Sequence, residues 1–97
     1  MPTYSRLARF IRDFEKLSTE EKIRFLKAVR AFVDDLAAGN GFRAGLRVKK
    51  MHGHEDIWEL SWAADGRATF SYGDPVKVGH AHIVWHRVGP HDIFIQP

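Results

Sequence analysis

Residues 57–72 read IWELSWAADGRATFSY, and this stretch decides the fold class. Apolar and polar side chains alternate on both sides of its centre, with the period of a half-buried β-strand. Asp65-Gly66 between the two runs is a strong hairpin signal. The stretch therefore predicts two antiparallel strands, at 57–62 and 67–72, joined by a tight turn.

Residues 4–38, which precede this hairpin, have the apolar spacing of helices instead. Apolar residues recur three or four positions apart, which predicts helices at about 4–16 and 19–38. Ser18, followed three residues later by Glu21, has the sequence of a capping box at the start of the second helix. The short break between the helices predicts an antiparallel hairpin. No strand is expected before it, because residues 1–5 run almost directly into the helical spacing.

Three further strands are expected from alternation in the remaining sequence, at about 46–51, 80–88 and 92–95. Two separate cores would each be too small to be stable in 97 residues, so a single domain spanning 1–97 is expected. The predicted class is α+β: a helical hairpin packed on one face of a twisted, mostly antiparallel sheet of four to five strands.

The alternation also predicts which side chains share a face of the sheet. The helices should cover Trp58, Leu60, Trp62, Phe70, Tyr72, Ile83 and Trp85. The opposite face should present Glu59, Ser61, Arg67, Thr69, Ser71, His82 and His86. An arginine and two histidines on one sheet face make it the first place to look for a functional site.

Positive charge is concentrated in the first half of the chain. Residues 1–50 hold twelve Lys and Arg against six Asp and Glu, whereas residues 51–97 hold three against six. This asymmetry favours nucleic acid or an acidic protein as a partner, although solvation of two helix faces also explains the charges before residue 36. The absence of cysteine excludes disulfides and thiolate metal sites. No apolar run approaches the roughly 20 residues that span a bilayer, so a cytoplasmic protein without membrane contact is expected.

All six histidines lie in the second half, at positions 52, 54, 80, 82, 86 and 91. Imidazole is the side chain that exchanges protons most readily near neutral pH. His80, His82 and His86 lie on one predicted strand, but its first and last histidines are about 20 Å apart in an extended chain and cannot share one ion. A metal-dependent enzyme built on this strand is kept as an alternative, and neither a metal nor another cofactor is predicted.

A second group of residues fits phosphate chemistry. Residues 49–54 read KKMHGH, and Arg67 and His91 follow further along the chain. Lysine and arginine neutralise a phosphate, and histidine exchanges protons. RNA cleavage through its own 2′-hydroxyl requires a base, a cation and an acid, and no metal. The group is therefore a candidate ribonuclease site.

The order of these segments resembles the RelE/ParE toxin superfamily. A helical hairpin is followed by the basic strand LRVKKM, then IWELSW, a tight turn, GRATFSY, HIVWHRVG and a closing HDIF. The WEL and GR motifs are most similar to HigB-type and phage-derived relatives, and the resemblance covers nearly the whole chain. It implies a toxin of a type II toxin–antitoxin pair. Most such toxins cut mRNA in the ribosomal A site without a metal, whereas the ParE branch poisons DNA gyrase.

The resemblance also implies roles for individual residues. Arg67 matches the arginine that opens the strand after the hairpin and binds the scissile phosphate. His91 and one of His52 or His54 are implied to exchange protons. The predicted RNA contacts are Arg47, Lys49, Lys50, His82, His86 and Arg87.

The implied partners are a cognate antitoxin protein, mRNA and ribosomal RNA. The chain departs from RelE at Glu59 and Ser61, which stand where RelE has a pair of basic residues. A carboxylate there repels phosphate unless it pairs with a cation or acts as a base. The alternative function is therefore a binding module with the same fold, directed at gyrase or RNA, that does not cleave.

Overall fold

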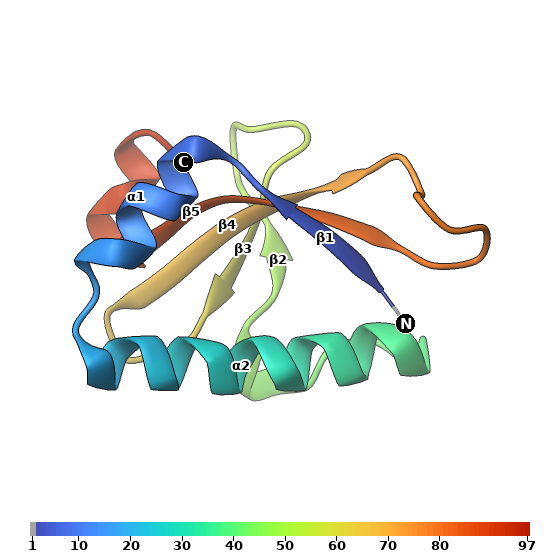
Figure 1. Ribbon diagram of the computed structural model, residues 1–97, viewed down its shortest axis with the longest axis horizontal. Helices are drawn as coiled ribbons and strands as arrows, with labels where there is room; N and C mark the ends of the chain where they lie inside the picture. Colours follow the sequence, from blue (N-terminus) through green and yellow to red (C-terminus); the bar gives the residue numbers. More distant parts are fainter. Residues whose placement is uncertain (1) are drawn as a thin grey trace.

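One mixed sheet of five strands is packed against two α-helices (Figure 1). The structure is a computed structural model and describes residues 2–97. Its strands are ordered β1-β5-β4-β3-β2, with β1 parallel to β5 and the other neighbours antiparallel. The elements are β1 (Thr3–Arg6), α1 (Ala8–Lys16), α2 (Thr19–Ala38), the 3-10 helix η1 (Ala44–Leu46), β2 (Lys49–Lys50), β3 (Trp58–Ser61), β4 (Gly66–Gly73), β5 (His82–Pro90) and the 3-10 helix η2 (His91–Ile95). The predicted α+β class is confirmed.

The start of α2 has the predicted capping box. The Ser18 hydroxyl accepts from the Glu21 amide at 3.1 Å, and the Ser18 amide donates to the Glu21 carboxylate at 2.8 Å. Two of the amide groups that a helix start leaves unpaired are thereby satisfied. The helix ends at Gly39, whose φ of 74° is left-handed and suits a residue without a Cβ atom. The prediction of a helix at 19–38 is confirmed.

The predicted hairpin of β3 and β4 is also confirmed, but Gly66 acts differently from the expected turn glycine. Its φ is not positive; instead, a Cβ atom at Gly66 would lie 2.6 Å from the indole ring of Trp62. The Trp62 ring therefore packs directly over the Gly66 backbone. Its Nε1 donates to the Arg67 carbonyl at 2.9 Å, which fixes the ring at the start of β4.

The beginning of the chain corrects the prediction of a helix at 4–16. Thr3–Arg6 form β1, and α1 begins only at Ala8. Local apolar spacing indicated a helix, but the amide of Thr3 donates to the Ala81 carbonyl of a segment far along the chain. A strand that is stabilised by so distant a partner cannot be recognised from its own periodicity. The expected absence of a first strand was wrong.

The remaining strand predictions need three corrections. The predicted strand 46–51 is a short 3-10 helix followed by the two residues of β2, because Arg47 between them has a left-handed backbone with φ 50°. The predicted strand 80–88 is shifted to His82–Pro90. The predicted strand 92–95 is the 3-10 helix η2, which turns the chain away from the sheet after Pro90.

The core lies between the helices and one face of the sheet. Of the seven residues predicted there, Leu60, Phe70, Ile83 and Trp85 are buried, and Trp58 and Trp62 pack partly buried against them. Tyr72 was wrongly placed in the core, since it is 45% exposed. Its ring nevertheless contacts Trp58 and Phe70 edge-on, at 5.7 and 5.8 Å between centroids.

A β-bulge interrupts the pairing of β4 with β5. Thr69 pairs with Arg87 and Phe70 with Trp85, so His86 is an extra residue between them. Such an insertion reverses the alternation of all later side chains in the strand. Val88 is therefore buried, whereas simple alternation from Trp85 would put Arg87 in the core.

Replacement of Gly66 by alanine is expected to destabilise the protein by about 1 to 3 kcal/mol, because the new methyl group overlaps the Trp62 ring. Urea unfolding of the Gly66→Ala variant measures this loss. Gly45→Ala is the matched control, since an added Cβ meets nothing within 4 Å there. Equal stability of the two variants would contradict the proposed packing.

A pH dependence is expected from the pair of Asp35 and Arg43, which joins the end of α2 to the segment before η1. The hydrogen bonds from Arg43 lower the pKa of Asp35 from 3.8 to about 2. Because the pKa is lower in the folded state, the pair stabilises the fold fully above pH 4 and loses this effect as the pH falls toward 2. An NMR titration should place the Asp35 midpoint near 2, and Arg43→Ala should raise it toward 3.8.

Candidate functional site

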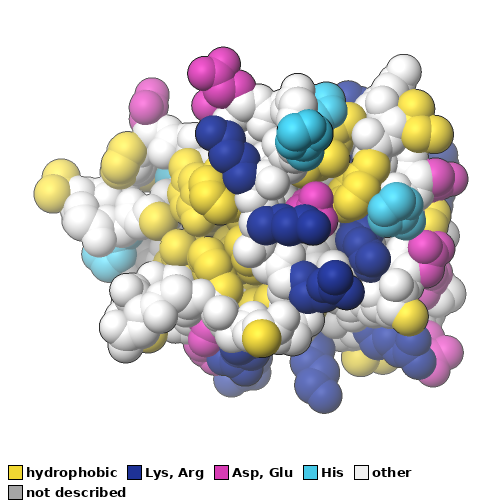
Figure 2. All heavy atoms as spheres, turned by 180° about the vertical axis from the view of Figure 1, so that it is seen from behind, with side chains coloured by type: hydrophobic (Ala, Val, Ile, Leu, Met, Phe, Trp, Pro, Cys, Tyr) yellow, Lys and Arg dark blue, Asp and Glu magenta, His cyan; other side chains and the backbone are white. Residues whose placement is uncertain are grey.

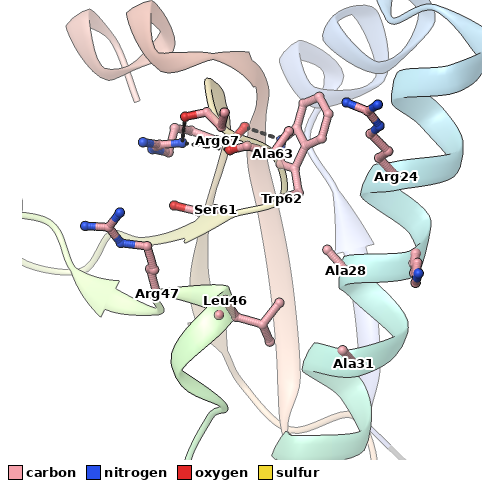
Figure 3. Close-up of a pocket in the computed structure, with 12 residues that line it drawn as sticks. Arg24, Ala28, Ala31, Leu46, Arg47, Ser61, Trp62, Ala63 and Arg67 are labelled. Carbon is pink, nitrogen blue, oxygen red and sulfur yellow. Dashed lines mark hydrogen bonds between the residues drawn. The ribbon is translucent and has the colours of Figure 1, made fainter.

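An open hollow of about 480 Å³ lies between α2, η1 and the hairpin of β3 and β4 (Figure 3). Four cations line it, and no aspartate or glutamate is among its lining residues. The cations are Arg24, Lys27, Arg47 and Arg67. Trp62 and Ser61 contribute an aromatic ring and a hydroxyl. A hollow with this lining attracts anions.

Arg47 and Arg67 form the centre of this site. Figure 3 shows both side chains pointing to the same side, with the Ser61 hydroxyl between them. Nη1 of Arg67 donates to the carbonyls of Ala63, Ala64 and Gly66 in the hairpin turn, at 2.9–3.3 Å. These bonds fix the guanidinium plane and leave its other edge available. Within residues 2–97, neither arginine forms an ion pair.

Two unpaired guanidinium groups on either side of a hydroxyl suit a phosphate oxyanion, which accepts several charge-assisted hydrogen bonds. The left-handed backbone of Arg47 adds to this interpretation. A non-glycine residue in that conformation costs on the order of 1 kcal/mol, and such residues concentrate at functional sites. The surrounding fold therefore imposes the direction of this side chain.

His91 reaches the same end of the sheet as Arg67. Arg67 pairs with Gly89 and Gly66 with Pro90, so His91 begins η2 one residue beyond the last pair. It lines a second hollow, which Asp65 of the hairpin turn and Phe94 also line. The His91 ring lies 4.9 Å from that of Phe94, between centroids. The sheet register thus places Arg67 and His91 at the same end of the sheet, where they line separate hollows.

His52 and His54 lie at the opposite end of the sheet. They belong to the loop after β2 and line a shallow hollow with Lys50. This loop returns to the sheet at Ile57, four positions before Ser61, or roughly 13 Å along an extended strand. The predicted catalytic group is therefore divided, with Arg67 at one end and the two histidines at the other.

The other predicted cations differ in whether they are paired. The Lys49 ammonium lies 3.8 Å from the Glu59 carboxylate, which is only 12% exposed. Arg87 forms a bidentate pair with Asp13 of α1 and donates to the Gln96 carbonyl at 3.0 Å. The Arg87 side chain thus holds α1, through Asp13, and the C-terminal segment, through Gln96, against β5.

The two histidines of β5 are bonded within the sheet. The His82 ring lies 2.7 Å from the Thr3 hydroxyl and 3.2 Å from that of Ser5. The His86 ring lies 2.8 Å from the Ser71 hydroxyl, and burial, followed by the charge of Arg9, lowers the pKa of His86. Among residues 2–97, no group of three histidine or carboxylate side chains could hold a metal ion.

Figure 2 shows the molecule from behind, with Lys and Arg side chains gathered at the centre of this face. One acidic side chain lies among them, and histidines appear at the margin. The sheet register puts Lys49 beside Glu59 and Arg67 beside Ser61 on one side of the sheet, and Figure 3 shows Arg47 pointing the same way as Arg67. These three cations make the basic face.

Four residues that line the two hollows were not predicted as site residues: Asp65, Trp62, Arg24 and Lys27. Asp65 served only as a turn signal, yet Asp65 and His91 line the same hollow, because Gly66 pairs with Pro90. This neighbour depends on the pairing of β4 with β5, which the hairpin motif alone does not give. Nothing in the periodicity of α2 indicated that Arg24 faces the hairpin.

The fold is that of the RelE/ParE-like toxins. Among solved structures, the chain is similar to YafQ in the E. coli DinJ–YafQ toxin–antitoxin complex, at 9% identity over 94% of this chain and 93% of that chain, with a TM-score of 0.65. It is similar to a chain of the RelB–RelE antitoxin–toxin complex from Methanococcus jannaschii, at 13% identity over 94% of both, with a TM-score of 0.60. A YoeB/ParE toxin from Agrobacterium tumefaciens matches at 11% identity over 92% of this chain and 98% of that chain, with a TM-score of 0.65.

No family model and no curated protein sequence matches the chain. The resemblance to the RelE/ParE superfamily is thus confirmed at the level of the fold. No helix within residues 2–97 has both the length and the apolar character to cross a membrane.

Replacement of Arg87 by alanine is expected to lower the free energy of unfolding by about 2 to 3 kcal/mol, because it leaves the largely buried Asp13 carboxylate without its partner. Denaturant unfolding measures the loss. The control is Arg24→Ala, which removes an exposed pair with Glu20 and should cost less than about 0.5 kcal/mol. Similar losses in both variants would exclude a structural role specific to Arg87.

Proposed function

We propose that this chain is the toxin of a type II toxin–antitoxin system and cleaves translated mRNA on the ribosome as a metal-independent endoribonuclease. The observation that carries the proposal is the unpaired Arg47 and Arg67 flanking the Ser61 hydroxyl, on a fold shared with YafQ and RelE. Those two proteins are described as toxins in complex with antitoxins, which supports a cognate antitoxin as the partner here.

In the proposed reaction, the 2′ oxygen of one nucleotide attacks the adjacent phosphorus and the bond to the 5′ oxygen breaks. Arg67 and Arg47 stabilise the charge that develops on the phosphate, the kind of electrostatic contribution that often dominates such catalysis. One proton leaves the 2′ hydroxyl group, and one is added to the departing 5′ oxygen. His91 exchanges one of these two protons. Asp65 is the candidate for the other proton, since Asp65 and His91 line one hollow.

The remaining cations and histidines bind the RNA outside the reacting phosphate. Lys50, His52 and His54, which line one hollow, contact the RNA strand away from the reacting phosphate. Lys49 contributes less charge, because Glu59 neutralises it in part. His82, His86 and Arg87 remain predicted RNA contacts, although each is already bonded within the protein. Basic residues on the helices add attraction to ribosomal RNA, which falls steeply with salt.

Expression of the chain is expected to arrest growth, and Arg67→Ala should abolish the arrest. Loss of one group that stabilises the transition state slows cleavage about a hundredfold or more. Arg47→Gly should act in the same direction, since glycine adopts the left-handed backbone and only the side chain is removed. Primer extension on cellular mRNA should show new ends aligned with codons for the parent chain alone.

The matched control is Lys77→Ala, which removes an exposed cation from the loop between β4 and β5, away from the basic face. It should arrest growth like the parent chain. Undiminished toxicity of Arg67→Ala, with the variant folded by circular dichroism, would exclude the assigned role of Arg67.

A second candidate is a toxin of the same fold that binds DNA gyrase or RNA without cleaving it. The observation that favours it is the largely buried Glu59 carboxylate beside Lys49 on the basic face, where it disfavours a phosphate. Growth arrest with damaged DNA and no new mRNA ends would establish this alternative. Codon-aligned mRNA ends would exclude it.

A further inference from the structure

The hollow of the candidate site exists because β3 loses its outer neighbour halfway along its length. The two residues of β2 pair with Trp58 and Glu59, and the chain before them turns at Arg47, whose backbone is left-handed. In the part of the chain that the structure describes, no strand pairs with Leu60 and Ser61 on the side away from β4. The hollow opens at this gap, between β3 and α2.

The walls of the gap carry short side chains. Figure 3 shows Ala28 and Ala31 of α2 on one side, with Leu46 of η1 on the other. Alanine and glycine fill no space beyond the Cβ atom, so the gap stays open to a ligand. The hollow of about 480 Å³ lies within the range of roughly 300–1,000 Å³ that is usual for small-molecule sites. Its other small lining residues are Gly45, Ala63 and Ala64.

Trp62 gives the hollow one rigid aromatic wall. Its ring packs over the Gly66 backbone and contacts the Phe25 ring, at 6.1 Å between centroids. Its Nε1 already donates to the Arg67 carbonyl at 2.9 Å. The ring therefore keeps its position without a ligand and offers apolar surface rather than a free donor. A flat group that packs against such a fixed wall orders little of the protein when it binds.

Positive charge lies on both sides of this apolar gap. Arg47 and Arg67 line it on the sheet side. Arg24 and Lys27 line it on the α2 side, about one helical turn apart. None of the described lining residues is acidic. Arg24 also lies 3.7 Å from the exposed Glu20 carboxylate, so the pair on the sheet side is the stronger anion site. A ligand that complements the hollow joins an anionic group to a flat, largely apolar one.

We propose that this hollow binds a single nucleotide, with the base in the gap between α2 and β3 and the phosphate on Arg47 and Arg67. The base packs against Trp62 and the alanine side chains. The nucleotide is either free or part of an RNA strand, because both present the same groups. This base subsite rests on the proposed function only in that Arg47 and Arg67 hold the phosphate, and it does not require cleavage.

A base in this gap is enclosed by protein side chains instead of a complementary strand. It must therefore be unpaired, which is the form of RNA that proteins read most readily through the bases. A phosphate alone uses the cations but leaves the alanine walls and the Trp62 ring without a contact. The base is thus the part of the ligand that the hollow distinguishes, and its contribution to binding is the quantity to measure.

The test measures the binding of small molecules to the full chain by NMR, through the indole N–H signal of Trp62. AMP should bind and shift this signal. Adenosine lacks the phosphate and ribose 5-phosphate lacks the base, so each should bind at least about tenfold more weakly than AMP. A strand of four deoxyadenosines has no 2′-hydroxyl and cannot be cleaved. It binds more tightly than AMP if the ligand is a strand, and no more tightly if the ligand is a free nucleotide.

Ala31→Leu should fill the gap and weaken AMP by at least about tenfold, while ribose 5-phosphate binds as it does to the parent chain. Ala28→Leu repeats this test from the preceding turn of α2, so the result does not depend on the folding of one variant. Ala38→Leu is the matched control, because Ala38 is an exposed residue of the same helix outside the hollow. It should bind AMP as the parent chain does. Arg67→Ala should weaken AMP and ribose 5-phosphate alike.

The proposal is overturned if ribose 5-phosphate binds as tightly as AMP, or if the leucine variants at positions 28 and 31 bind AMP as the Ala38→Leu variant does. These measurements need neither a ribosome nor cleavage. Intact AMP binding by a chain that does not arrest growth would remove the nuclease and keep the base subsite. Growth arrest by a chain that does not distinguish AMP from ribose 5-phosphate would do the reverse.

Discussion

The indole of Trp85 joins the helices to the sheet, and the rest of the structure depends on this contact. Four phenylalanine rings surround it, with centroids 5.5 to 6.0 Å away. They are Phe10 of α1, Phe25 and Phe32 of α2, and Phe70 of β4. Aromatic rings in tilted and edge-on contact add to the free energy of burial, so one residue of β5 orients both helices and its neighbouring strand.

The parts of the fold that were predictable from sequence are those with local causes. The alternation in 57–72 specified a hairpin, and Ser18 with Glu21 specified a helix start, because each signal acts within a few residues. β1 was not predictable in the same way, since its hydrogen bonds come from β5. η2 was missed because the four residues 92–95 are too few to distinguish a strand from a 3-10 helix. Both errors lie at chain ends, where the sequence pattern is shortest.

The residue types of the candidate site could be proposed from the sequence, whereas their arrangement depends on the sheet. Arg67 and His91 come to the same end of the sheet because of the pairing of β4 with β5. His52 and His54 were assigned to the same group on chemistry alone, although the length of β3 separates them from Arg67. Arg87 illustrates a related limit. Nothing in the local sequence distinguishes a cation that binds RNA from one that holds α1 in place through Asp13.

The extra residue His86 has a consequence for β5 as a whole. A regular strand offers one inner and one outer row of side chains along its entire length, but β5 follows two such patterns in succession. In the first half, which pairs with β1, the inner row holds Ile83 and Trp85. After His86 the inner row shifts by one residue, so Val88 is buried and the strand leads into η2. The single inserted residue therefore lets one strand meet two requirements: the aromatic core and β1 on one side of His86, and the turn into η2 on the other.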